Sequence, residues 1–378
     1  MKTDKYLLSN YEQTEQSITL NTTEKNDTLW QAYQAKKAET PMLFPTEGAI
    51  ALGVSEFELL LSSPHSRYLG ENCREMLLEL HTLGVMESIV RNEFCVHEKQ
   101  GVYRNLEIGK TMGLALGEGD GLDLRIFMQK FKHMLAIINP DKKNPSYCIA
   151  FFDQNGHAIN KAFLTKFDDE TLTIWQNLTD KYAKTAPSEI EMLSILPQDE
   201  WIFHPLNAEA KQNFGKDWLN MTDVHQFHSI LGKYELDRAS GYVQAPDNMT
   251  TAVRPEMIEA LLEKLASEQV NSMIFVGNTG LVQIFGGTLH HVKRMGDWIN
   301  IMDKKQTGFT MHLKDKALSQ VWFVKRPHND GFTSAFEGFD KKGNSILAIF
   351  GERHEGQAQD LKWQVLAQSL ADEFKIVS

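Results

Sequence analysis

The chain has 378 residues, of which 42% are hydrophobic and 24% charged, and its mean hydropathy is -0.35. These values are typical of a globular protein, and the length allows two or three domains. The net charge of -11 argues against a nucleic-acid binder or a protein that docks on anionic membranes, because both classes need a positive field. The N-terminus lacks the apolar core of a signal peptide, and no apolar run is long enough to span a membrane. We therefore expect a cytoplasmic protein that is not embedded in a membrane.

The first half of the chain begins with helical patterns and continues with short strand patterns. Residues 1–25 are polar, and we expect a poorly ordered lead-in there. Helices are predicted over residues 29–37, over 46–63 with a break at Gly53, and over 73–83. Strands are predicted over 102–106, 112–116, 123–127, 133–138, 147–152 and 162–167, and a helix centred on Trp175 follows them. Because no helix separates these strands, the pattern indicates an antiparallel meander in an α+β fold.

Several characteristic residues of this first half recur later in the chain at nearly constant spacing. Arg91-Asn92 is echoed by Gly277-Asn278, the turn that begins at Asp153 is echoed at Asp340, and Trp175 is echoed by Trp363. The period is near 187 residues, which indicates an internal duplication in which each half carries an antiparallel sheet and a closing helix. We expect an N-terminal repeat over 26–190, a connector over 191–270 and a C-terminal repeat over 271–378.

The connector contains the segment that we consider most informative about function. Asp223 is predicted to cap a short helix whose apolar positions, at helical spacing, are Val224, Phe227, Ile230 and Leu231. His225 and His228 would then project from one side of that helix. A neutral imidazole is a good iron ligand, so either histidine is a candidate haem ligand, whereas the alternative is an ordinary hydrogen-bonded surface or core histidine.

The remaining cysteines and histidines carry weaker signals. Cys73, Cys95 and Cys148 are widely spaced, so they suit neither a disulfide framework nor a metal knuckle, and we expect inert core thiols. Only Cys73, next to Arg74, has a context that favours a thiolate. The pair His290-His291 has no cysteine or carboxylate at a spacing typical of zinc sites, which indicates a structural or solvated role.

Several long motifs in the same order along the chain resemble the HemS/ChuS/HmuS family of bacterial haemin-utilisation proteins. They are R-N-E-F-C-V-H-E at 91–98, L-D-L-R at 122–125, M-T-D-V-H-Q-F at 221–227, L-D-R at 236–238, F-V-G-N at 275–278, W-x-N at 298–300, R-P-x-x-D-G at 326–331 and G-E-R at 351–353. The resemblance covers roughly residues 30–375. It implies two similar halves, each built on a large antiparallel β-sheet with helices, and a haem cleft between them.

The resemblance also implies roles for individual residues. His225 matches the axial ligand of the haem iron, and Arg125 matches an arginine on the opposite haem face, where a guanidinium holds a water without changing its protonation state. Three further arginines match cations that bind the haem propionates: Arg238, Arg326 and Arg353. His228 matches a position that is aromatic in many relatives and a second histidine in some, so an alternate ligand and a packed core residue are both open. Ala348 and Phe350 replace a glutamine and a tyrosine of the relatives, so two polar contacts with the haem are expected to be missing.

Two functions from different classes follow from this resemblance. The first is an enzyme that opens the haem ring oxidatively and releases iron, with His225 and Arg125 as the catalytic pair and an external electron donor, because no dinucleotide or flavin motif is present. The second is a carrier that passes imported haem to another protein without degrading it. Either function implies haem and an inner-membrane importer or a reductase as partners, and no nucleic acid. Transcriptional control through the N-terminal helices is disfavoured by their acidic residues.

Overall fold

The computed structural model describes residues 15–21, 26–139, 145–187, 189–195, 198–353 and 358–377. Two nine-stranded sheets dominate it, and their neighbouring strands are antiparallel. The first sheet has the order β15 (Val292–Met295), β16 (Trp298–Asp303), β17 (Phe309–Leu313), β4 (Cys95–Val102), β3 (Val85–Arg91), β10 (Ala158–Leu164), β9 (Ser146–Phe152), β8 (His133–Asn139) and β2 (Ser66–Gly70). The second has the order β12 (Thr250–Val253), β18 (Gln320–His328), β19 (Gly331–Phe339), β20 (Ser345–Gly351), β13 (Ser272–Gly277), β14 (Leu281–Gly287), β7 (Asp123–Ile126), β6 (Gly113–Ala115) and β5 (Glu107–Ile108).

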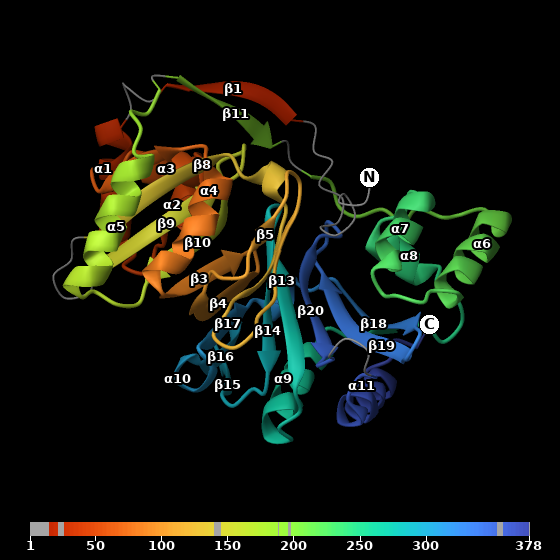
Figure 1. Ribbon diagram of the computed structural model, residues 1–378. Helices are drawn as coiled ribbons and strands as arrows, with labels where there is room; N and C mark the ends of the chain where they lie inside the picture. The colour runs from red at the N-terminus through yellow and green to blue at the C-terminus, as the bar shows by residue number, and fades with distance from the viewer. Residues whose placement is uncertain are drawn as a thin grey trace.

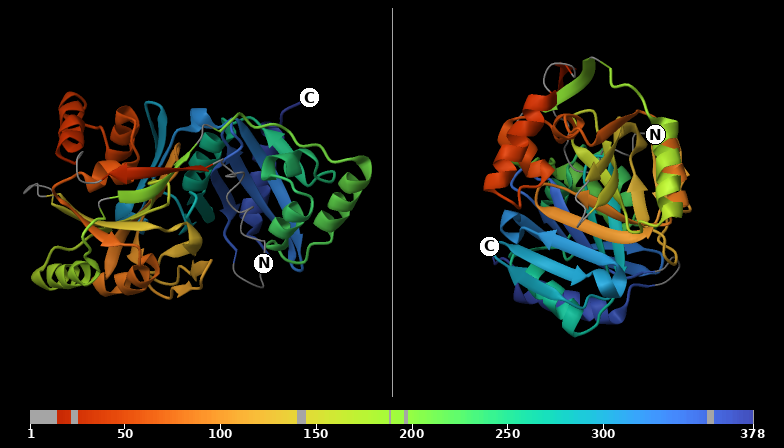
Figure 2. Two further views of the ribbon diagram at one scale, coloured as in Figure 1. Left: turned by 90° about the horizontal axis from the view of Figure 1, so that it is seen from above. Right: turned by 90° about the vertical axis from the view of Figure 1, so that its left-hand side faces the viewer.

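Helices cover these sheets in the same way in each half (Figures 1 and 2). One face of the first sheet packs against α4 (Cys73–Glu79) and α5 (Asp169–Tyr182), and one face of the second packs against α9 (Met257–Ser267) and α11 (Leu361–Glu373). Three further helices lie on the other face of each sheet. They are α1 (Asn26–Glu39), α2 (Pro45–Leu52) and α3 (Glu56–Leu61) in the first half, and α6 (Ala208–Leu219), α7 (Gln226–Lys233) and α8 (Arg238–Val243) in the second. The predicted α+β fold with two similar halves is confirmed.

The strand orders show that the two halves exchange a three-stranded segment. β5, β6 and β7 come from the first half of the chain but extend the second sheet beside β14. β15, β16 and β17 come from the second half but extend the first sheet beside β4. Each sheet is therefore composite, so each half depends on the other for a third of its strands. β12 and α9, which lie in the predicted connector, hold the places that β2 and α4 hold in the first half.

Two equivalent asparagines, Asn92 and Asn278, form hydrogen bonds between the two halves. Asn92 donates from its side-chain amide to the carbonyls of Gly277 and Ile346, at 3.2 and 2.8 Å. Asn278 donates in the same way to the carbonyls of Arg91 and Ile159, at 3.1 and 2.8 Å. The internal symmetry that the spacing of these asparagines predicts is thus visible in their contacts.

Some predicted elements differ from the structure. The strand predicted at 102–106 is wrong, because β4 ends at Val102 and Tyr103 turns inward, where its hydroxyl lies 2.7 Å from the buried polar side chains of both Ser88 and Asn160. Two central strands, β3 and β4, were not predicted. Within the predicted lead-in, residues 15–21 form β1 (Glu15–Asn21), which pairs with β11 (Glu189–Ile195), because the alternation of S-I-T-L at 17–20 suits a strand. Residues 1–14 and 22–25 of the lead-in lie outside the described residues.

Candidate functional site

One face of the second sheet gathers most of the residues that the sequence singled out. Residues directly opposite each other in antiparallel strands share a face, so the pairing register fixes its membership. A row runs from Glu337 on β19 through Ala348 on β20 and Phe275 on β13 to Ile284 on β14 and Asp123 on β7. Neighbouring rows of the same face hold Arg326 at one end of the sheet and Arg125 at the other.

The middle of this face is an apolar floor, which we define as Met273, Phe275, Val282 and Phe350. All four side chains are partly exposed. The rings of Phe275 and Phe350 lie 4.9 Å apart. The helices α6, α7 and α8 contact the sheet at β18 and β19, whereas α9 and α11 lie on the opposite face (Figure 1). The floor is therefore left partly open between the helices and β7.

His225 lies just before α7 and not within it, so the prediction that Asp223 caps this helix is wrong. The helix begins at Gln226, and the carboxylate of Asp223 instead accepts hydrogen bonds from the backbone N–H and from Nδ1 of His225, both at 2.7 Å. A short aspartate side chain readily bonds to the backbone two residues later, which competes with helix formation. Because Asp223 engages Nδ1, the free ring nitrogen of His225 is Nε2, on a side chain that is 87% exposed.

His228 projects differently from His225, so the two histidines do not share one helix side as predicted. His228 faces the sheet, and its Nδ1 is buried without a hydrogen-bond partner among the described residues. Burial, together with the positive charges of Arg238 and Arg326, holds the pKa of His228 well below its usual value. This ring is therefore neutral at physiological pH.

Two of the predicted arginines form a buried cluster with a glutamate that the sequence did not reveal. Glu337 is fully buried and accepts from Arg238 at 2.8 Å, from Arg326, and from the hydroxyl of Tyr242 at 2.7 Å. Arg326 also lies over the ring of Phe227 on α7, with its guanidinium carbon 4.5 Å from the ring centre. The Nε atoms of both arginines are buried and have no partner among the described residues. We call Arg238, Arg326, Tyr242 and Glu337 the arginine cluster.

Electrostatic interactions within the arginine cluster keep Glu337 ionised. Burial alone would raise the pKa of Glu337, but the two guanidinium groups and the hydroxyl of Tyr242 lower it to about 2. The carboxylate is therefore ionised at physiological pH, and the cluster has one more positive charge than negative charges. The sequence analysis missed Glu337, although a charged residue within the otherwise apolar run F-E-G-F of β19 is a signal that could have identified it.

Arg353 lies near the same end of the sheet. Its guanidinium donates to the hydroxyl of Thr333 at 3.1 Å. Hydrogen bonds from His225 lower the pKa of Asp223, and the charge of Arg353 contributes a smaller part of that shift. His328 on β18 is also close to Arg353, whose charge adds to burial in lowering the pKa of that ring. The described structure thus brings Arg353 towards the loop of His225.

Arg125 lies at the far side of the apolar floor. Its Cα partners are Val282 on β14 and Leu114 on β6, so β7 is an interior strand and not an edge. The guanidinium donates to the carboxylate of Asp123 at 2.5 Å, and its side chain remains 30% exposed. β7 and β19 are four strand spacings apart, or about 19 Å, so Arg125 and the arginine cluster frame the floor from opposite sides.

The other candidate groups have structural roles in the described part of the chain. The three cysteines are buried, and burial raises the pKa of Cys73, so the thiolate alternative is not supported. The backbone N–H groups of His290 and His291 donate to the carboxylate of Asp303. Among the described residues, no three His, Cys, Asp or Glu side chains form a group suited to a metal ion, and no helix is long and apolar enough to cross a membrane.

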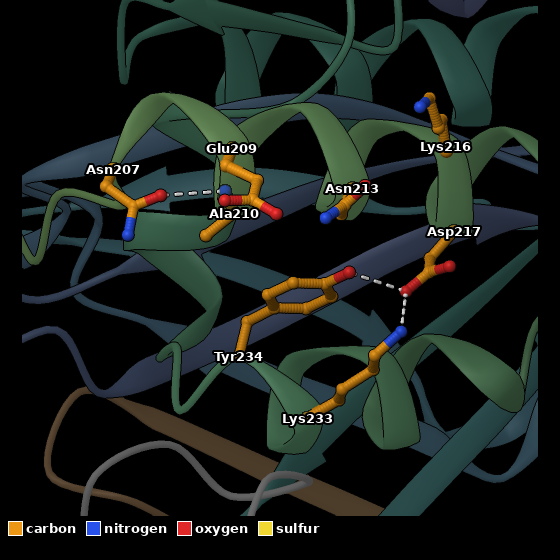
Figure 3. Close-up of a pocket in the computed structure, with 8 residues that line it drawn as sticks. All are labelled: Asn207, Glu209, Ala210, Asn213, Lys216, Asp217, Lys233 and Tyr234. Carbon is orange, nitrogen blue, oxygen red and sulfur yellow. Dashed lines mark hydrogen bonds and ion pairs between the residues drawn. The ribbon is translucent and has the colours of Figure 1, made fainter.

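A shallow pocket between α6 and α7 is separate from the apolar floor (Figure 3). Its lining is mostly polar: Asn207, Glu209, Ala210, Asn213, Lys216, Asp217, Lys233 and Tyr234. Asp217 accepts from Lys233 at 2.6 Å and from the hydroxyl of Tyr234 at 2.7 Å, so its carboxylate is already engaged. None of the predicted site residues lines this pocket.

The fold and the site define a class of protein: a duplicated α+β chain whose second sheet presents an apolar floor between arginines and histidines. The family model described as the haemin-degrading HemS/ChuX domain matches the chain twice, at residues 53–182 and 235–370. The chain belongs to this family, and the two matches correspond to the two halves.

Similar proteins include a curated relative and two solved structures. The chain is 31% identical over 343 residues to the hemin transport protein HmuS of Yersinia pestis, covering 90% of this chain and 96% of the relative. The crystal structure of holo-PhuS, a heme-binding protein from Pseudomonas aeruginosa, has a TM-score of 0.82 and 28% identity, covering 93% of this chain and 99% of that one. ChuS, described as a heme oxygenase of E. coli, has a TM-score of 0.78 and 26% identity, covering 91% and 99%.

Proposed function

We propose that this protein binds haem on the apolar floor of the second sheet and degrades it oxidatively to release iron. The observation that carries the proposal is the arrangement of one sheet face: an apolar strip with Arg125 on one side and the arginine cluster with the histidine helix on the other. A flat apolar ring with two carboxylates fits such a face in chemistry, because the strip buries the ring and the cations attract the acids. The descriptions of PhuS as a heme-binding protein and of HmuS as a hemin transport protein support the binding of haem, and the description of ChuS as a heme oxygenase supports its degradation.

His225 is the proposed axial ligand of the haem iron. Its Nε2 has no hydrogen-bond partner among the described residues, and Asp223 orients the ring through Nδ1, which is the outer contact that metal-binding histidines commonly have. Arg125 is the proposed group on the other haem face, where it would hold a water by hydrogen bonds. Arg238, Arg326 and Arg353 are the proposed propionate contacts, of which Arg326 is the most buried.

Haem in this proposal is the substrate, and it supplies the iron at which dioxygen reacts. The protein contributes the axial ligand, a dry apolar surface and a fixed cation on the open face. Electrons would come from an external donor, so a reductase is a proposed partner, together with an inner-membrane haem importer that delivers the substrate. This assignment places the protein in the cytoplasm.

A second candidate function is a carrier that delivers imported haem without degrading it. The neutral ring of His228 supports this alternative, because its Nδ1 lies beside the arginine cluster and has no partner in the part of the chain that the structure describes. A second imidazole within reach of the first would let iron change ligands during transfer. The two functions share one binding site and differ in what happens to the ring.

The binding site is tested by absorption spectra of the haemin complex of the wild-type protein, His225→Ala and His228→Ala. We expect His225→Ala to disturb the resting ferric spectrum most, because it removes the axial nitrogen. An unchanged Soret band in His225→Ala would refute the ligand assignment. The same titration establishes whether the wild-type chain binds haemin at all.

The reaction is tested by adding ascorbate to the haemin complex under air with catalase present. Loss of the Soret band together with a tetrapyrrole product and free iron is the expected result. Catalase removes free hydrogen peroxide, so bleaching by that oxidant does not imitate the enzyme. A stable Soret band whose haem moves to an apo-acceptor would instead support the carrier.

A further inference from the structure

Glu337 stands out because its buried carboxylate pairs with both arginines of the cluster. It lies on the same sheet face as the apolar floor, in one row with Ala348 and Phe275. Its side chain is fully buried, and its two oxygens bind Arg238, Arg326 and the hydroxyl of Tyr242. The arginines that the proposed function assigns to haem carboxylates thus already share a carboxylate.

The protein holds these groups in one arrangement from three elements. Arg238 and Tyr242 come from α8, Arg326 from β18 and Glu337 from β19. Tyr242 links the members further, because its hydroxyl accepts from Arg326 at 2.6 Å and donates to Glu337. Arg326 is in turn covered by Phe227. The carboxylate is therefore fixed by its partners, and its charge stays beside the arginines.

We propose that Glu337 is an affinity-setting residue that acts as an internal competitor for the haem carboxylates. The inference rests on the proposed haem-binding function. An acid tail that approaches Arg238 or Arg326 meets a cation whose charge is partly offset and also meets the negative charge of Glu337. Both effects weaken binding and speed release. A protein that must let its ligand or product go benefits from such a residue.

The inference predicts the direction of a neutralising substitution. Glu337→Gln keeps the size and one acceptor but leaves two buried cations without a counter-charge. The haem-free variant should therefore have a lower Tm than the wild type, and haemin should raise its Tm by more. Haemin release to excess apomyoglobin should be at least about tenfold slower than from the wild type, which is a moderate effect for a close charge pair.

Two controls separate this inference from a general effect on the fold. Glu56→Gln neutralises a buried carboxylate on α3 in the first half, which pairs with Lys161, so it should leave haemin release unchanged. Haemin dimethyl ester lacks the two carboxylate charges, so Glu337→Gln should not slow its release. Equal slowing for haemin and for the ester would overturn the inference, as would unchanged or faster haemin release from a folded Glu337→Gln variant.

A second comparison covers the case in which Glu337→Gln fails to fold. Arg238→Gln leaves Arg326 paired with Glu337, and Arg238→Gln with Glu337→Gln leaves Arg326 as the single buried cation of the cluster. The double variant should release haemin more slowly than Arg238→Gln alone, and the reverse order would overturn the inference. If the wild-type protein does not bind haemin, the proposed function itself fails, which is a different outcome.

Discussion

At the scale of single residues, the contact between Asp223 and His225 decides which imidazole nitrogen is available. A carboxylate that accepts from Nδ1 fixes the ring orientation and makes Nε2 the basic nitrogen in the neutral form. The exposed position of His225 would otherwise leave its ring free to rotate. The geometry therefore assigns Asp223 to positioning the ring, although its sequence context indicated only a helix cap.

Asp223→Ala should weaken haemin binding by about 10- to 100-fold, the usual cost of losing the outer contact of a metal-binding histidine. A Soret titration measures the change. Asp217→Ala is the matched control, because Asp217 is an ion-paired carboxylate on α6 that contacts Lys233 and Tyr234, away from the floor (Figure 3). Equal affinities for Asp223→Ala and the wild type would show that Asp223 does not position the ligand.

At the scale of elements, α7 is held to the second sheet by a few large side chains. Phe227 and Leu231 are fully buried, and the ring of Phe227 packs at 4.7 Å from the ring of Trp218 on α6. Phe227 also covers Arg326 from β18. The helix that begins beside His225 is thus packed against the arginine cluster, so the positions of His225 and Arg326 depend on one aromatic contact.

Phe227→Ala should lower the free energy of unfolding by about 3–5 kcal/mol, the usual cost of removing a buried aromatic ring. Haemin binding should weaken as well, because α7 loses its main anchor. Urea unfolding and a Soret titration measure the two effects. Val243→Ala on α8, where the side chain is 42% exposed, should change neither. A stable Phe227→Ala variant with normal haemin affinity would contradict the anchoring role of Phe227.

At the scale of the whole molecule, the exchange of β5–β7 for β15–β17 makes the two halves interdependent. The spacing of Asn92 and Asn278 predicted the duplication, because equivalent turns keep equivalent residues. The exchange itself was not predictable, because a local strand pattern does not say which sheet a strand joins. The same limit applies to the site: motifs identified Arg125 and Arg238, whereas the role of Glu337 depends on pairing between distant strands.

Asn278→Ala should lower the free energy of unfolding by about 1–3 kcal/mol, because it leaves backbone groups of both copies without partners. The asparagine donates to two carbonyls of the first half and accepts from the N–H groups of Gly280 and Leu281. Chemical denaturation measures the loss. Asn213→Ala, at the rim of the pocket on α6, should have little effect. Equal stabilities of the two variants would argue against the joining role of Asn278.

A buried histidine at the contact between the two halves should make the stability of the protein depend on pH. His97 and Gln283 are buried, occupy equivalent places in the two copies and meet at 2.9 Å, where Nδ1 of the ring accepts from the amide. Burial, with a contribution from the charge of Lys99, lowers the pKa of His97 to about 3. An unfolded chain takes up this proton near pH 6.5, so the folded state loses stability as the pH falls from about 6.5 towards 3.

His97→Gln should remove this dependence, which amounts to at most about 1.4 kcal/mol per pH unit between these limits. The measurement is the free energy of unfolding against pH from 7 to 4.5, and the slope is the relevant quantity because the substitution also changes packing. His81→Gln, which replaces an exposed histidine ring, is the matched control. An unaltered slope in His97→Gln would contradict the prediction. It would mean that the buried ring accepts its proton in the folded state, so that His97 does not cause the pH dependence.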